Sequence, residues 1–174
     1  VSKEVFANEM VNGSVSKLAA ALWGSATTSI NDLAKGLAGA AGTGRIIDVA
    51  KEVYARVGKS VSATAAALWK NATSDAAVLA KALDGAAGSS KIVDIAKEVY
   101  SRLGKSVNKT SNALWKNATS NLGTLAKGLA GAAGSKQIAT IGEAVYVKSG
   151  KNIGRTTDAL WKNATSNAGD WRRL

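Results

Sequence analysis

The sequence predicts an all-α protein built from tandem helical hairpins, and three observations support this. First, tryptophans recur at an interval of 46 residues, and the tyrosines keep the same interval. Second, apolar residues between these aromatics follow steps of three and four, which is the spacing of one helix face. Third, the chain has 18 glycines and no proline, so helices can end at glycine and otherwise run unbroken. We expect 46-residue hairpins that stack into a bundle or a short α-solenoid.

The repeat can be read directly from the text of the sequence. The segment 67–74, Ala-Leu-Trp-Lys-Asn-Ala-Thr-Ser, returns at 113–120 and at 159–166, and the segment 91–100 closely matches 45–54. Units of this kind share one continuous core, because a single unit cannot bury enough apolar surface alone. We therefore predict one repeat domain over 1–174, with units at about 1–23 (partial), 24–69, 70–115, 116–161 and 162–174 (terminal partial).

The first helix of a hairpin is predicted to run from Ser60 to Asp84, where a glycine-rich break follows. The apolar stripe passes through the segment 71–74 without a change of phase, which favours one long helix. The alternative is a stop at 71–74, and it would give three short helices per unit. A second, shorter helix is expected from about Ser90 to Leu103.

The glycine-rich segments 36–44 and 128–134 invite comparison with a phosphate-binding loop. That loop needs a preceding strand and a Gly-Lys-Ser/Thr ending that opens a helix, and these two segments have neither. We expect their glycines to cap helix C-termini and to allow close contacts between helices.

Most aromatic residues lie on the repeat interval, and we predict that they supply bulk to an alanine-rich core. The other interpretation is an interfacial belt of aromatic side chains that dips into lipid headgroups. The residues are Trp23, Trp69, Trp115 and Trp161, together with Tyr54, Tyr100 and Tyr146.

The composition argues against catalysis, metals and cofactors. The chain has no cysteine and no histidine, which excludes disulfides, thiolate chemistry, structural zinc sites and histidine-based triads. Its 12 acidic residues mostly recur at equivalent positions, such as Asp48 and Asp94, which is typical of solvated helix faces. We predict a non-enzymatic protein that uses no cofactor.

The positive charge of the chain is arranged in rows. The formal net charge is +11, and cations recur at the repeat interval. In a stacked array each row would form a stripe that suits an anionic membrane surface or another polyanion. The alternative is that the charge only keeps an alanine-rich surface soluble. The four rows are Lys59, Lys105 and Lys151; Lys70, Lys116 and Lys162; Lys35, Lys81 and Lys127; and Arg56, Arg102 and Lys148.

One unit carries a Gly-Lys-Ser-Val turn at 58–61, an Ala-Leu-Trp-Lys segment at 67–70, and Leu79, Leu83 and Gly85 in a leucine-rich stretch. This arrangement resembles the leaderless and circular bacteriocins of saposin-like fold, one repeat unit at a time. The chain departs from them in being a tandem array and in carrying Asp and Glu in its short helix. The resemblance implies a secreted, membrane-active, antimicrobial protein that binds and permeabilises anionic bacterial membranes.

Two other functions follow from the repeat and the charge. Open-ended repeats can stack end to end, so the protein is alternatively a self-assembling fibre, surface layer or scaffold, and a homo-oligomer. Nucleic-acid binding through the basic stripes comes third and is disfavoured. The tryptophans are too few and too regular for base stacking, and no known nucleic-acid module is recognisable.

Overall fold

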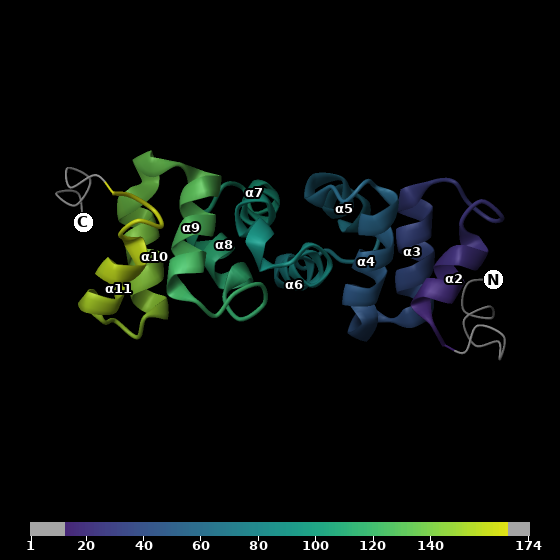
Figure 1. Ribbon diagram of the computed structural model, residues 1–174, viewed down its shortest axis with the longest axis horizontal. Coiled ribbons are helices and arrows are strands. Elements are labelled where there is room, and N and C mark those ends of the chain that lie inside the picture. Colours follow the sequence, from purple (N-terminus) through teal and green to yellow (C-terminus); the bar gives the residue numbers. More distant parts are fainter. Residues whose placement is uncertain (1–12, 167–174) are drawn as a thin grey trace. The chain divides into compact units, whose positions relative to one another are not determined.

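The computed structural model describes residues 13–166, and these form ten α-helices with no β-strand (Figure 1). The predicted all-α class is confirmed. The parts of the predicted partial units at 1–12 and 167–174 lie outside the described residues. The helices are α2 (Val15–Leu22), α3 (Ile30–Ala41), α4 (Ile46–Arg56), α5 (Val61–Leu68), α6 (Ala76–Ala87), α7 (Ile92–Arg102), α8 (Val107–Leu114), α9 (Leu122–Ala133), α10 (Ile138–Lys148) and α11 (Ile153–Leu160). Short 3-10 turns, η1 (Thr43–Arg45), η2 (Ser89–Lys91) and η3 (Ser135–Gln137), precede α4, α7 and α10.

The predicted long helix from Ser60 to Asp84 is wrong, because α5 ends at Leu68 and α6 begins at Ala76. After α5 the backbone turns sharply, and Lys70 adopts a left-handed conformation with φ 67°. The chain therefore follows the alternative of three short helices per unit, and the predicted two-helix hairpin is wrong.

Polar side chains between α5 and α6 provide the physical reason for this stop. Asn71 Nδ2 donates to the carbonyl oxygen of Ala67 at 2.9 Å, which satisfies a carbonyl at the end of α5. Asp75 then caps α6, because its Oδ1 accepts hydrogen bonds from the N–H groups of Ala77 (2.7 Å) and Val78 (3.1 Å). Such local bonds compete with helix continuation and outweigh an apolar stripe that contains mainly alanine here.

The same kind of turn follows four of the helices. Each is marked by a backbone bridge between its tryptophan and the threonine four residues later. These pairs are Trp23 and Thr27, Trp69 and Thr73, Trp115 and Thr119, and Trp161 and Thr165.

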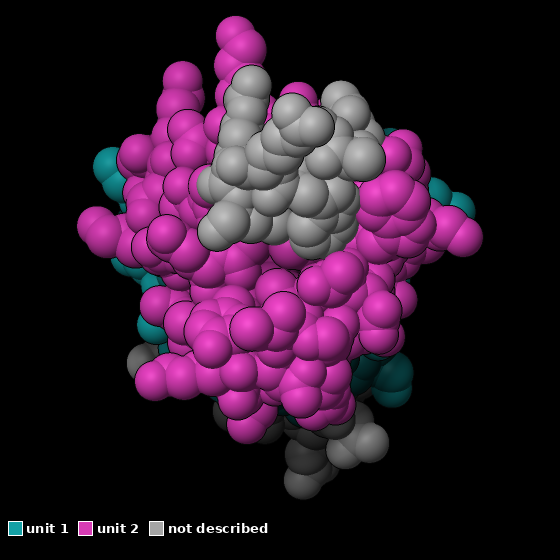
Figure 2. Space-filling view, turned by 90° about the vertical axis from the view of Figure 1, so that its left-hand side faces the viewer, with its two compact units in different colours: residues 1–88 teal, residues 89–174 magenta. Residues whose placement is uncertain are grey.

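The chain divides into two compact units, residues 1–88 and 89–174, coloured separately in Figure 2. In the first unit α4 packs against α3 and α6, and α5 contacts all three. In the second unit α9 packs against α7, α10 and α11, and α8 contacts α7, α9 and α10. Leucine and isoleucine side chains fill the two cores. The largest fully buried ones are Leu18, Leu33, Leu37, Leu68, Leu79 and Leu83 in the first unit, and Ile95, Leu114, Leu125, Leu129, Ile138 and Ile141 in the second.

Glycine allows one close helix approach in each unit. A Cβ atom at Gly85 of α6 would lie 2.6 Å from Cγ2 of Ile47 in α4. A Cβ atom at Gly131 of α9 would lie 2.5 Å from Cγ1 of Val93 in α7. The expected close contact is confirmed in the segment 128–134 at Gly131, whereas a Cβ atom at Gly39 of the segment 36–44 would meet nothing within 4 Å. The expected C-terminal caps are confirmed in both segments, since helices α3, α6 and α9 end at glycines with positive φ. These are Gly42, Gly88 and Gly134, with φ of 76°, 83° and 83°.

Candidate anion-binding surface

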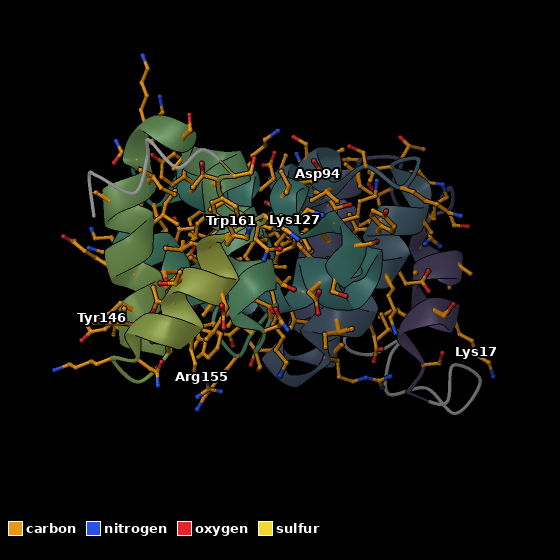
Figure 3. All side chains as sticks on the ribbon, turned by 60° about the vertical axis from the view of Figure 1, so that its left-hand side comes forward. Lys17, Asp94, Lys127, Tyr146, Arg155 and Trp161 are labelled. Atoms are coloured by element: carbon orange, nitrogen blue, oxygen red, sulfur yellow. The ribbon has the colours of Figure 1, made fainter. Side chains whose placement is uncertain are left out.

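Nine lysines of the predicted rows are exposed, and they fall into two groups by backbone setting. Three lie within helices and are called the helix lysines: Lys35 in α3, Lys81 in α6 and Lys127 in α9 (Lys127 is labelled in Figure 3). Six follow helix ends and are called the turn lysines: Lys59, Lys70, Lys105, Lys116, Lys151 and Lys162.

Half of the turn lysines follow the helices α4, α7 and α10. The first helix shows the pattern: Gly58 is left-handed with φ 65°, and the N–H of Lys59 donates to the carbonyl oxygen of Tyr54 at 2.9 Å. This six-to-one hydrogen bond beyond a left-handed glycine is the Schellman arrangement that ends many helices. Ser60 then caps α5 with its side chain, so Lys59 stands between a helix stop and a helix start. The same hydrogen bond joins Lys105 to Tyr100 and Lys151 to Tyr146, each at 2.9 Å.

The other three turn lysines lie in the turns that follow α5, α8 and α11. In the first of these turns the N–H of Lys70 donates to the carbonyl oxygen of Thr73 at 2.8 Å. Gly24 holds the equivalent place after α2, where its N–H donates to Thr27 at 2.9 Å and its φ is 81°. Glycine therefore fits this turn, and three of the four turns carry lysine instead.

All six turn lysines have a left-handed backbone, and within residues 13–166 they are the only non-glycine residues with positive φ. Their φ values lie between 59° and 67°. An L-residue in this region carries a penalty of about 1–2 kcal/mol that glycine escapes. Backbone strain of this kind concentrates at functional sites, where the side chain is needed despite the penalty.

The fourth predicted row differs, because its members are half-buried and contact their own neighbours. Arg56 pairs with Glu52 at 2.6 Å, and its guanidinium carbon lies 5.9 Å from the ring centroid of Trp23. Arg102 pairs with Glu98 at 2.5 Å in the same way. Lys148 Nζ donates to Asn112 Oδ1 at 2.6 Å. This row has less charge available to an outside anion than the nine exposed lysines have.

The aromatic rows lie at the edge of the core. Six of the seven side chains are half-buried: Trp23, Trp69, Trp115, Tyr54, Tyr100 and Tyr146. The seventh, Trp161 at the end of α11, is 39% exposed and is labelled in Figure 3. Two apolar residues of the same region were not identified from the sequence, Val147 (60% exposed) and Ile153 (74% exposed).

The burial of the Asp84 carboxyl group was also not predicted from the sequence. Its Oδ1 is buried near the end of α6 and has no hydrogen-bond partner among the described residues. Burial raises the pKa of this carboxyl above its ordinary value, because the charged form is poorly solvated there. The signal in the sequence was a break in the repeat, since alanine stands at both equivalent positions, Ala38 and Ala130.

Every helix in 13–166 falls short of the length and apolarity needed to cross a bilayer. The same part of the chain holds no cluster of three or more acidic side chains arranged to bind a metal ion.

Comparison of the chain with protein-family models, with curated proteins and with solved structures finds no match. A proposal about function therefore depends on the fold and on the geometry of the surface.

Proposed function

We propose that this protein is a non-enzymatic, cationic, membrane-active protein that binds anionic membrane surfaces through its turn lysines. The observation that carries the proposal is that six exposed lysines, and no other non-glycine residues of 13–166, adopt the left-handed backbone. A lysine needed only for solubility has no reason to occupy a strained position that glycine fills without penalty. A lysine near an anionic bilayer contributes about 1 kcal/mol of attraction, which can offset the strain.

The exposed apolar residues near α11 favour lipid over a soluble polyanion. Val147 and Ile153 stand on either side of Lys151 in the sequence, and Trp161 directly precedes Lys162. Cations beside exposed tryptophan and aliphatic side chains are typical of segments that bind at the headgroup boundary. This combination supports the resemblance to the saposin-like bacteriocins, and with it a secreted, antimicrobial protein.

Permeabilisation would require the helices to move apart. The longest described helices have 12 residues and span about 18 Å, against a hydrocarbon core of about 30 Å. We infer that bound protein exposes the leucine-rich faces of its short helices to lipid instead of inserting a single spanning helix.

Dye release from vesicles tests the proposal. Vesicles that contain phosphatidylglycerol should leak when the protein is added, and tryptophan emission should shift to shorter wavelength. Vesicles of phosphatidylcholine alone should do neither, and added salt should weaken the effect because it screens exposed charges. Absence of leakage together with an unchanged tryptophan spectrum on anionic vesicles would refute the membrane proposal.

A second candidate, self-assembly, is favoured by one comparison between helix starts. Ile153 at the start of α11 is 74% exposed, whereas the equivalent Val107 at the start of α8 is 4% exposed. The helix lengths 8, 12 and 11 recur in order along the chain, which supports 46-residue units of three helices stacked in a bundle or short α-solenoid. In such an array Ile153 would pack against a neighbouring unit, and the self-assembly candidate assigns that unit to another copy of the protein. Analytical ultracentrifugation that finds only monomer at high concentration would exclude this candidate.

A further inference from the structure

A cavity of about 260 Å³ lies between α8 and α10 in the second unit. Its wall combines apolar surface, to which Ala144 and Val147 contribute, with polar side chains that include one carboxylate and one ammonium group. The residues that matter are Asn108, Ser111 and Asn112 from α8, and Glu143, Ala144 and Lys148 from α10.

The hydroxyl group of Ser111 lacks a partner. The residue is only 1% exposed, and its Oγ makes no hydrogen bond within the described part of the chain. A buried hydroxyl left unsatisfied costs about 1–3 kcal/mol, so its presence on the wall of a cavity calls for an explanation. The position does not require a hydroxyl, because alanine is buried at the equivalent positions 19 and 65.

The charged groups of the cavity are also incompletely paired. Lys148 Nζ donates to Asn112 Oδ1 at 2.6 Å, which leaves further ammonium protons and the Nδ2 donor of Asn112 available. Glu143 has no ion-pair partner among the described residues. The cavity therefore combines a carboxylate, which can accept hydrogen bonds from a ligand, with ammonium, amide and hydroxyl groups that can donate them.

In the equivalent groove of the first unit, between α2 and α4, the glutamate is paired with a cation of its own helix. Glu52 pairs with Arg56 at 2.6 Å, and the residue before Glu52 is a lysine. In the second unit Ala144 replaces that glutamate, so Lys148 has lost the carboxylate one helical turn earlier. Glu143 replaces the lysine, which inverts the charge beside it. The second groove thus departs from the repeat at the positions that line its cavity.

We propose that this cavity binds a small zwitterion, with the ligand ammonium at Glu143 and the ligand carboxylate at Lys148, Asn112 and Ser111. A simple anion would be repelled by Glu143. A sugar is disfavoured, because none of the lining residues is aromatic and no ring is available for stacking. The volume is slightly below the range of about 300–1,000 Å³ for drug-sized ligands, which fits a molecule the size of an amino acid.

Titration of the full chain with glycine, β-alanine and 4-aminobutyrate tests the proposal, because these probes vary the distance between the two charges. Amide NMR signals of α8 and α10 should shift and saturate with at least one of them. Ethylamine and propionate, which each carry one charge, should bind at least about tenfold more weakly, because each loses a charge-assisted hydrogen bond. Failure of all three zwitterions to give a saturable shift would overturn the proposal, as would equal binding of glucose.

Two variants make the test specific to the cavity. Ala144→Glu restores the residue found at positions 52 and 98, where it pairs with the cation four residues later, so the fold should tolerate it. This variant should fill the cavity, pair with Lys148 and abolish binding. Lys136→Gln, an exposed change outside the cavity, should leave binding intact. Unchanged zwitterion affinity in a folded Ala144→Glu protein would place the ligand elsewhere and refute the assignment.

Discussion

Replacing Gly131 by alanine is expected to lower the free energy of unfolding by about 1 kcal/mol. The new Cβ would lie 2.5 Å from Cγ1 and 3.0 Å from Cγ2 of Val93, where carbon atoms prefer a separation of about 3.5–4.0 Å. Valine in a helix has one strongly preferred rotamer, so Val93 cannot swing aside and α9 must shift away from α7. Overpacking of this kind costs about 1–3 kcal/mol, and the better helix propensity of alanine returns about 1 kcal/mol.

The matched control is Gly39→Ala in α3, because a Cβ atom there meets nothing within 4 Å. Only the propensity gain remains, so this variant should be stabilised by up to about 1 kcal/mol. Urea unfolding followed by far-ultraviolet circular dichroism should separate the two variants by about 2 kcal/mol. If alanine stabilises the protein equally at both positions, the close packing of α9 on α7 is refuted.

Four further substitutions test the turns and the buried carboxyl. Lys70→Gly should stabilise the protein by about 0.5–1 kcal/mol in urea unfolding by removing left-handed strain, and a loss of stability would contradict the strain argument. Asp84→Ala should stabilise the protein by an amount that grows as pH rises. The raised pKa means that the wild type loses stability as the carboxyl ionises, and it loses none below the ordinary pKa, where the group is protonated in both the folded and the unfolded states. A stability difference that stays constant across pH would refute this cause. Asn117→Ala should cost about 1 kcal/mol by removing the 3.0 Å bond to the end of α8. Asn163→Ala, whose bond to the Trp161 carbonyl is 3.4 Å, should cost less in the same urea unfolding measurement.

The sequence was sufficient to predict the all-α class and the glycines that end helices. Both depend on local properties, namely helical periodicity and the backbone freedom of glycine. The prediction failed between α5 and α6, where the apolar spacing of a helix continues through the linker although the backbone turns. There the capping side chains of Asn71, Thr73 and Asp75 decide the conformation. The exposure of the lysine rows followed from their spacing, but their left-handed backbone did not, because lysine carries no preference for it. Only Gly24, at the repeat position equivalent to Lys70, gave a hint.

The cavity of the second unit could not be predicted from sequence for a different reason. It depends on how α8 and α10 pack and on an absent side chain at Ala144, whereas sequence patterns report which faces are apolar. The sequence shows that positions 111, 143 and 144 differ from their repeat equivalents. It does not show that they lie together, because that depends on how the helices pack.

The central claim, that the turn lysines bind an anionic membrane, is tested most directly by two variants of equal net charge. One carries asparagine at all six turn lysines, because asparagine tolerates the left-handed backbone. The other carries asparagine at six exposed lysines outside the rows: Lys17, Lys51, Lys91, Lys97, Lys109 and Lys136. Partitioning of each variant onto phosphatidylglycerol vesicles is then measured by centrifugation. The turn-lysine variant should bind at least about tenfold more weakly than its control. Equal partitioning of the two variants would contradict the claim and leave only the total charge as the cause of binding.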